Sequence, residues 1–291
     1  MRETVGVVGL GLLGHAVASR LAAAGHRVVG HDVVPARGDA LKTLGGEPAP
    51  SVAAVTAESE IVCTLLPSLD AVEHVILGRG GIVDTARPGT TVIQMSTISP
   101  TLTETLAREV TSRGHGFLDC PVSGTSGMVE RGNGVIFVGG ERALFDRRQS
   151  TLGAVLPRPI YVGRAGQAMT LKLVANLLVA LHSAAAAEAL TMARRAGLDL
   201  GLVLDVLGSG AATSRMLEVR GPLIAQGEFP PQMKLDLFMK DLHLIQDAAR
   251  AVDAPLPLTD VAERLYAAVA AEGHGGEDLA VVARVFETRR A

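Results

Sequence analysis

Lys172 lies in an apolar helical segment, residues 168–181, that contains no other charged side chain. Burial disfavours the charged form of a lysine and lowers its pKa toward the range in which it exchanges protons with a substrate. Asn176 lies four positions later and shares a helix face with it. We therefore expect an acid/base lysine with an amide beside it. A lysine that extends its ammonium group to water remains the alternative.

A glycine-rich turn near the N-terminus has the spacing G-x-G-x-x-G between a strand pattern and a helical pattern. The first glycine permits a tight turn, the second lets the backbone approach a pyrophosphate, and the third lets the helix pack close to the strand. N–H groups at the start of that helix can bind phosphates. Dinucleotide contacts are expected from the whole turn: Gly9, Leu10, Gly11, Leu12, Leu13 and Gly14.

An acid at the end of the next expected strand favours NAD over NADP as the cofactor. Asp32 follows the segment 27–31, at the distance from the turn at which a carboxylate accepts a ribose 2′-hydroxyl. A carboxylate there repels a 2′-phosphate, and Val33 and Val34 follow it where an arginine would bind one. Arg37 is close enough in the sequence to leave NADP open.

The chain has 291 residues, which is long enough for two domains, and its pattern changes near Gly163. Alternating strand and helix patterns predict an α/β domain over residues 1–163, a Rossmann-type doubly wound parallel sheet that binds the dinucleotide. Helical patterns alone predict an all-α substrate and dimerisation domain over 164–291. Strands are expected at 4–8, 27–31, 60–65, 91–95, 116–118, 135–138 and 159–162, and C-terminal helices at 165–196, 200–207, 233–252, 259–271 and 278–286.

The long connecting helix expected at 165–196 would measure about 45 Å at about 1.5 Å per residue. Because this exceeds the width of a small domain, we expect part of it to pack against a second subunit. A homodimer or homotetramer assembled through the helical domain is therefore predicted.

Composition excludes several other classes of protein. Hydrophobic residues make up 48% and charged residues 20%, which is a globular balance. A net charge of −3 without charge runs gives no basis for nucleic-acid or membrane binding. Cys63 and Cys120 lack metal or redox spacing, so we expect buried thiols and no metal. The N-terminus enters a strand pattern at once and the apolar run 168–181 is short for a membrane span, so a cytoplasmic protein is expected.

Five segments occur in order along the chain: the turn 9–14, Gln-Met-Ser-Thr-Ile-Ser-Pro at 94–100, Asp-Cys-Pro-Val-Ser-Gly-Thr at 119–125, the segment 166–176 and Lys-Asp-Leu at 240–242. Together they resemble those of the β-hydroxyacid dehydrogenase family, which includes 3-hydroxyisobutyrate dehydrogenase and tartronate semialdehyde reductase. The resemblance covers nearly the whole chain. It implies reversible hydride transfer between NAD(P) and a small β-hydroxyacid, such as 3-hydroxyisobutyrate, or the matching semialdehyde.

The resemblance implies catalytic and substrate-binding roles for four residues. Ser123 and Gly124 would bind the substrate carboxylate, Lys172 would be the acid/base, and Asn176 would orient the substrate and the lysine. Without the surrounding motifs, Ser123 and Gly124 would be interpreted as an ordinary turn.

The resemblance also places four residues beside the cofactor. Thr97 follows a strand at the edge where parallel sheets bind ligands, and Leu66 and Pro67 occupy a similar edge. Lys240 would reach the cofactor from the helical domain. The alternatives are a proline strand terminator at Pro67 and a surface ion pair between Lys240 and Asp236.

The chain departs from the usual family pattern at five positions. Leu13 replaces a methionine, Gln94 an aspartate, Thr125 a glycine, Ala168 a glycine and Met233 a phenylalanine. Thr125 and Met233 could reshape the substrate pocket, so the identity of the substrate stays open.

Two rival functions also stay open. One is an imine reductase on the same fold, although those relatives tend to carry another residue where Lys172 stands. The other is a non-catalytic NAD(P)-binding module, which would usually lack the lysine or its amide.

Overall fold

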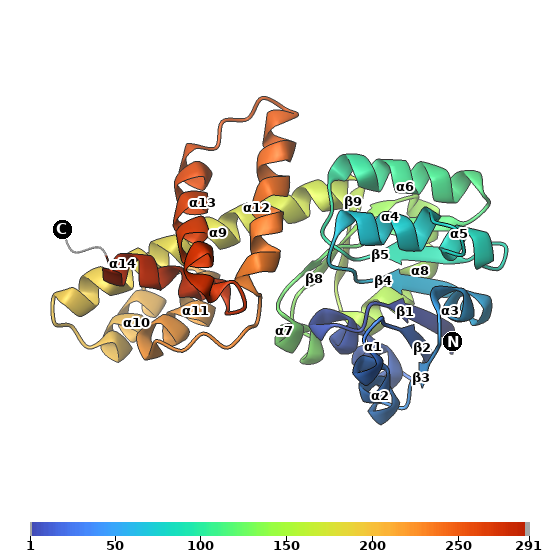
Figure 1. Cartoon of the computed structure of the whole chain (residues 1–291), viewed down its shortest axis with the longest axis horizontal. Helices are drawn as coiled ribbons and strands as arrows, with labels where there is room; N and C mark the ends of the chain where they lie inside the picture. The colour runs from blue at the N-terminus through green and yellow to red at the C-terminus, as the bar shows by residue number, and fades with distance from the viewer. Residues whose placement is uncertain (1, 289–291) are drawn as a thin grey trace. The chain divides into compact units, whose positions relative to one another are not determined.

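The computed structural model describes residues 2–288, which pack as two compact units divided after Lys172 (Figure 1). The first, the sheet unit, is α/β, and the second, the helical unit, contains helices connected by loops. The predicted fold class is therefore confirmed. The last strand ends at Gly163, but the start of the next helix packs with the sheet, because Met169 is buried in its core. Residues 1–163 and 164–291 remain our proposed domains.

The sheet unit contains, within the described residues, a nine-stranded sheet of order β3-β2-β1-β4-β5-β6-β8-β7, with β9 beside β8. Parallel pairing extends from β3 to β6, and the strand order reverses between β1 and β4. Ligands bind at such a reversal, outside the carboxyl ends of the strands. The strands are β1 (Thr4–Val8), β2 (Arg27–His31), β3 (Glu47–Pro48), β4 (Ile61–Thr64), β5 (Thr91–Gln94), β6 (Gly116–Asp119), β7 (Val122–Ser123), β8 (Val135–Gly140) and β9 (Pro159–Gly163).

The prediction of a wholly parallel sheet is wrong at one edge, because β8 runs antiparallel to both β6 and β7. The helix between β7 and β8, α7 (Ser126–Glu130), has five residues. A helix this short cannot cross the sheet and return the chain in the parallel direction. Ser123 ends β7, which runs in the same direction as β6, and follows the last residue of β6 by four positions.

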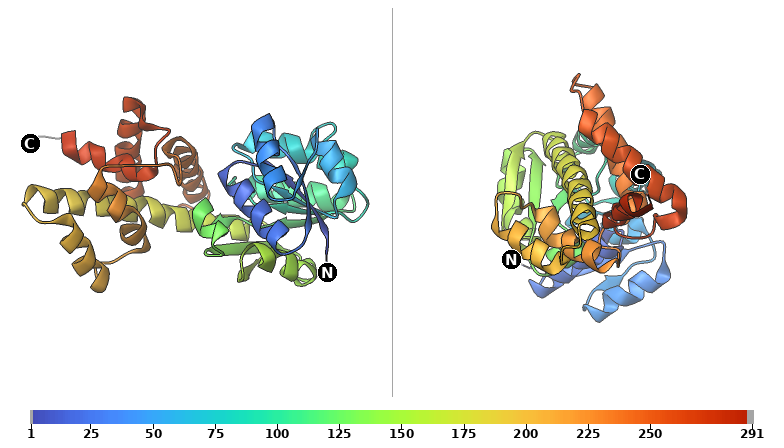
Figure 2. Two further views of the ribbon diagram at one scale, coloured as in Figure 1. Left: turned by 90° about the horizontal axis from the view of Figure 1, so that it is seen from below. Right: turned by 90° about the vertical axis from the view of Figure 1, so that its left-hand side faces the viewer.

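Helices cover both faces of the sheet (Figure 2). One face buries Leu21 and Leu152 and the other buries Ile76 and Leu106. Serine side chains begin three of these helices by accepting a backbone N–H of the first turn. Besides α7 the helices are α1 (Leu12–Ala23), α2 (Pro35–Thr43), α3 (Val52–Glu58), α4 (Leu69–Leu77), α5 (Ile82–Thr85), α6 (Pro100–Ser112) and α8 (Arg142–Val155).

The helical unit contains one helix that the sequence did not predict, α11 (Arg215–Gln226). Pro222 lies inside it and Gly221 precedes the proline, so the local propensity for helix is poor. Packing against the neighbouring helix compensates for this poor propensity. The two helices approach closely at Gly221, where an added Cβ would lie 2.5 Å from a methyl group of Leu204. The others are α9 (Gln167–Arg195), α10 (Leu200–Ser209), α12 (Leu235–Arg250), α13 (Pro257–Val269), η1 (Ala270–His274), η2 (Leu279–Ala283) and α14 (Arg284–Thr288).

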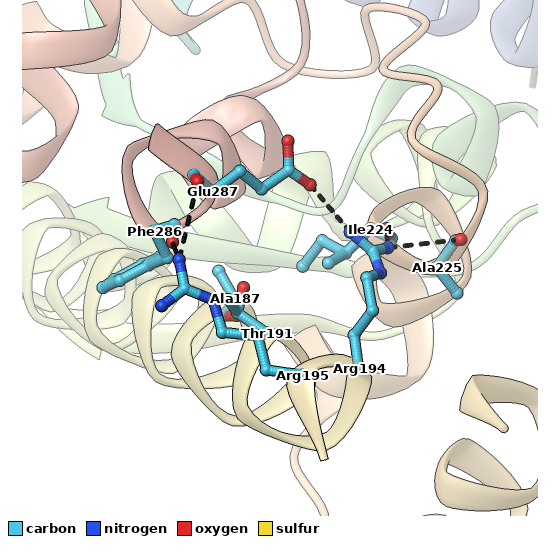
Figure 3. A network of polar contacts seen from close by, with 8 residues as sticks. All are labelled: Ala187, Thr191, Arg194, Arg195, Ile224, Ala225, Phe286 and Glu287. Atoms are coloured by element: carbon cyan, nitrogen blue, oxygen red, sulfur yellow. Dashed lines mark hydrogen bonds and ion pairs between the residues drawn. The ribbon is translucent and has the colours of Figure 1, made fainter. Parts of the chain in front are cut away.

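Two arginines at the end of α9 donate hydrogen bonds to backbone carbonyl groups of α11 and α14 (Figure 3). Arg194 donates to the carbonyl of Ile224 at 2.7 Å and pairs with Glu287 at 2.7 Å. Arg195 donates to the carbonyl of Phe286 at 2.8 Å. Ile224 lies in the last turn of α11, where carbonyl groups lack a partner within the helix, so Arg194 supplies one.

Helix α9 has 29 residues and is, by length and composition, apolar enough to cross a membrane. The apolar run 168–181, expected to be too short for a span, forms one part of this longer helix. In the structure, 44% of its most apolar window is buried inside the protein, and Asn176 is 2% exposed. These features are typical of a core helix.

Candidate active site

Backbone packing requires two of the three glycines in the turn after β1. Gly9 adopts φ 94°, and a Cβ there would lie 2.2 Å from the carbonyl oxygen of Leu65. A Cβ on Gly14 would lie 1.9 Å from the carbonyl oxygen of Gly9. The turn is further fixed by a 2.9 Å hydrogen bond from the Gly9 N–H to His31. The predicted roles of Gly9 in the turn and Gly14 in close packing agree with this geometry.

The middle glycine faces open space. A Cβ on Gly11 would meet no heavy atom within 4 Å, and Leu12, the first residue of α1, is 59% exposed. Gly11 makes no side-chain cap and the first turn of α1 contains no acidic residue. The N-terminal N–H groups and the positive end of the helix dipole are therefore available to an anion. A dinucleotide pyrophosphate fits this cradle.

Asp32 is tied to the glycine turn. Its Oδ2 accepts the N–H of Leu10 at 2.7 Å, its Oδ1 accepts the N–H of Val34 at 2.8 Å, and Arg37 pairs with it at 3.1 Å. Burial raises the pKa of Asp32, but hydrogen bonds from Val34, Leu10 and Arg37 outweigh it and hold the pKa below its ordinary value. The ionised carboxylate of Asp32, paired with Arg37, therefore lies where the ribose of the cofactor is expected.

The ends of β4 and β5 are linked by a network that the sequence did not predict. The Ser96 hydroxyl accepts the N–H of Leu66 at 2.8 Å. The Gln94 amide donates to the Ser96 carbonyl at 2.9 Å and accepts the Ser96 N–H. Pro67 and Thr97 follow directly on the two linked loops. The replacement of the usual aspartate by Gln94 is the sequence feature that could have indicated this network, since an amide both donates and accepts whereas a carboxylate only accepts.

Ser123 ends β7, and Gly124 follows in an extended conformation with φ 155° that favours glycine. The hydroxyl of Thr125 accepts the N–H of Met128 at 3.3 Å and so begins α7. The departure from the family pattern at Thr125 thus has a local structural role.

Asp119, the last residue of β6, holds the start of α9. Its Oδ2 accepts the N–H groups of Gly166 and Met169, each at 3.0 Å, and the carboxyl is fully buried. Burial raises the pKa of Asp119 to about 7, against the opposing effect of the two N–H groups. Lys172, one turn further along α9, is 6% exposed. The predicted acid/base is therefore a buried lysine of the sheet unit.

The raised pKa of Asp119 predicts how stability depends on pH. The neutral acid is favoured in the folded state, so this contribution is complete below about pH 4 and is lost as pH rises to about 7. Relative to Asp119→Asn, the free energy of unfolding of the wild type should fall by up to about 1.4 kcal/mol per pH unit between about pH 4 and pH 7. Above about pH 7 the difference between the two proteins should stay constant. Urea unfolding of both proteins from pH 4.5 to 8.5 measures the difference, and a difference that is constant over this whole range would contradict the assignment.

In the helical unit, Asn176 donates its amide to Oδ2 of Asp241 at 2.8 Å, and both side chains are buried. The Lys240 ammonium lies 3.2 Å from the other carboxylate oxygen of Asp241. The ion pair shown for Lys240 is thus with its chain neighbour Asp241. Asp241 was missed as a candidate, although it follows Lys240 directly in the Lys-Asp-Leu segment.

Met233 precedes α12 and is half-buried. Its N–H donates to Oδ2 of Asp278 at 2.9 Å, and the same buried carboxylate pairs with Arg220 at 2.9 Å. A buried ion pair thus fixes the loop that carries Met233.

The structure therefore gathers most of the predicted residues in the sheet unit, at the carboxyl ends of its strands. They are the turn Gly9, Leu10, Gly11, Leu12, Leu13 and Gly14, with Asp32, Leu66, Pro67, Thr97, Ser123 and Gly124. Lys172 also belongs to the sheet unit, whereas Asn176 and Lys240 belong to the helical unit.

Comparison with known proteins matches two family models that together cover almost the whole chain. Residues 4–163 match the NAD-binding domain of 6-phosphogluconate dehydrogenase. Residues 166–286 match the NAD-binding domain of NADP-dependent 3-hydroxyisobutyrate dehydrogenase.

Individual relatives agree over the full length. The chain is 33% identical to L-threonate dehydrogenase of Cupriavidus necator, covering 98% of this chain and 97% of the relative. It is 34% identical to 2-hydroxy-3-oxopropionate reductase of Escherichia coli, covering 97% of each. The crystal structure of 3-hydroxyisobutyrate dehydrogenase from Salmonella typhimurium superposes with a TM-score of 0.90 at 31% identity, over 97% of this chain and 99% of that one. The chain is therefore an NAD(P)-dependent enzyme of the β-hydroxyacid dehydrogenase family.

Proposed function

We propose that this enzyme interconverts a small β-hydroxyacid and its aldehyde or ketone acid, with Lys172 as the acid/base. The observation that carries the proposal is the burial of Lys172, which is 6% exposed on a helix whose first turn is fixed to the end of β6. Buried lysines serve as acids and bases in enzymes, whereas solvated surface lysines usually do not. A solvated surface lysine, the alternative, does not fit this burial.

The residues at the edge of the sheet would fix the reacting molecules. The glycine turn and the start of α1 would hold the dinucleotide, whose nicotinamide when bound accepts or supplies the hydride. The Ser123 hydroxyl and the Gly124 N–H would donate to the substrate carboxylate. Lys172 Nζ would take the hydroxyl proton during oxidation and return it to the carbonyl oxygen during reduction.

Asn176 would set the orientation of the substrate, and Asp241 would set that of Asn176. Because the Asn176 NH₂ group donates to Asp241, its amide oxygen is directed to other partners. Lys172 and Asn176 lie four residues apart on α9, so both present their side chains to one helix face. The same family resemblance supports Lys240, Leu66, Pro67 and Thr97 as cofactor contacts.

NAD is the proposed cofactor, with Asp32 as the residue that discriminates against NADP. Asp32→Asn keeps the shape and an acceptor oxygen for Leu10 but removes the charge that repels a 2′-phosphate, and it releases Arg37 from its ion pair. We expect the ratio of kcat/KM for NAD to that for NADP to fall about 10 to 100-fold. Steady-state kinetics with both cofactors measure it. An unchanged ratio would remove Asp32 from cofactor selection.

A substrate panel tests the proposed function. It would contain 3-hydroxyisobutyrate, glycerate, threonate, 4-hydroxybutyrate and sulfonated analogues, each with NAD and NADP, and a cyclic imine with each reduced cofactor. Turnover of at least one hydroxyacid is expected. Turnover of the imine alone would favour an imine reductase, and NAD binding without any turnover would indicate a non-catalytic module.

We also propose a cytoplasmic homodimer or homotetramer that assembles through the helical unit. Leu202 and Val206 lie four residues apart on α10 and are 63% and 62% exposed, and Leu198, just before the helix, is 57% exposed, which leaves an apolar patch on this part of the unit. Cys63 and Cys120 are buried free thiols, as expected in a reducing compartment. Sedimentation equilibrium tests the assembly, and a monomer at micromolar concentration would refute it.

A further inference from the structure

The start of α9 depends on a residue that is distant in the sequence. The four residues before the helix are Gly163, Arg164, Ala165 and Gly166, so none of them has a side chain that commonly caps a helix. Oδ2 of Asp119 takes that role, accepting the N–H groups of Gly166 and Met169 across 47 and 50 residues of sequence.

The surroundings of Asp119 leave it little freedom. Its Oδ1 is buried and accepts no hydrogen bond within the part of the chain that the structure describes. A Cβ on Gly139 would lie 3.3 Å from Oδ2 of Asp119 and 2.7 Å from the Arg164 carbonyl oxygen, so β8 approaches Asp119 closely. Gln94, the register partner of Asp119 on β5, adds no second charge.

Asp119 connects the two groups of residues proposed to handle the substrate. It precedes Ser123 by four residues, and through Met169 it holds the helix turn that leads to Lys172. We propose that Asp119 is a positioning residue, which places Lys172 relative to Ser123 by fixing the first turn of α9 to the end of β6. This inference rests on the proposed function for its catalytic meaning.

Other ionisable groups lie near Asp119 and the start of α9. Cys120 adjoins it in the chain, and Glu104 of α6 lies against Gly166, where a Cβ would approach its side chain to 2.9 Å. Arg164 pairs with Glu104 at 3.7 Å. Glu104→Gln removes a charge that lies against the Gly166 loop while leaving both hydrogen bonds to Asp119, and so provides a matched control.

The test observes Lys172 directly in the full-length protein. The chain has four lysines, so ¹³C-lysine labelling gives few side-chain signals, which Lys→Arg variants assign. Asp119→Ala removes the acceptor, so it should move the Lys172 signal and should speed amide hydrogen exchange at Gly166 and Met169 at least about tenfold. Glu104→Gln should leave all three unchanged.

Two results would overturn the proposal. The first is faster exchange at Gly166 with an unmoved Lys172 signal, which would make Asp119 a helix anchor without influence on the lysine. The second is measured in the wild type, so it decides the matter even if Asp119→Ala does not fold. The Lys172 signal should change at the pH at which labelled Asp119 titrates, and a Lys172 signal that does not change at that pH would contradict the coupling.

Activity provides a separate readout. Asp119→Ala should lower kcat about tenfold and shift its pH profile, with KM for NAD unchanged, because the glycine turn follows β1 and not β6. A raised KM for NAD with an unchanged kcat would refute the positioning role. If the wild type turns over no hydroxyacid, the proposed function fails, while the Lys172 signals still decide whether Asp119 controls that side chain.

Discussion

Lys172→Ala is expected to reduce hydroxyacid turnover by about 10² to 10⁴-fold, the range that general acid–base catalysis contributes. NAD affinity should stay within about threefold of the wild type, since the glycine turn and Asp32 lie on other elements. Stopped-flow hydride transfer and fluorescence titration of the reduced cofactor measure the two quantities. Full turnover in the variant would show that the lysine is not the acid/base.

Two further lysine variants separate charge from proton transfer. Lys172→Arg keeps a cation, but a guanidinium does not release its proton near neutral pH, so turnover should stay low. Lys42→Ala removes a lysine that is exposed and pairs with Asp39 at 2.8 Å. It should behave as the wild type. Recovery of activity in Lys172→Arg would indicate that a positive charge alone is sufficient.

Alanine at two glycines of the turn is expected to give opposite phenotypes. Gly14→Ala places a methyl group 1.9 Å from the Gly9 carbonyl oxygen, so the protein should lose about 3 kcal/mol or more of stability. Gly11→Ala meets no atom within 4 Å and should fold normally. Its methyl group would occupy the approach to the pyrophosphate, so NAD should bind about 100-fold more weakly, a loss of about 2.7 kcal/mol.

Thermal unfolding without cofactor and calorimetric titration with NAD distinguish the two variants. Gly153→Ala is the control for an added methyl group within a helix, because Gly153 lies in α8 and a Cβ there would meet no heavy atom within 4 Å. It should keep both stability and affinity. Normal NAD binding by Gly11→Ala would place the pyrophosphate elsewhere.

Local patterns predicted much of the fold and part of the site. The strands at Thr4–Val8 and Arg27–His31 match their predicted bounds, because β-branched runs between glycine turns are a short-range signal. The long helix Gln167–Arg195 was predicted within two residues at either end. Helix α11 was missed, since its proline and glycine lower the local propensity and only packing on α10 compensates.

The amino-acid sequence by itself determined the turn, the acid that follows it and the lysine in an apolar helix, because each is encoded by spacing within one element. Tertiary structure decided which groups hold these residues in place. Asp119 reaches the start of α9 and Asp241 reaches Asn176 across 65 residues, and β8 reverses direction at the edge of the sheet. Such contacts join residues far apart in the chain, where no periodicity or spacing specifies a partner and only the packed fold brings donor and acceptor together.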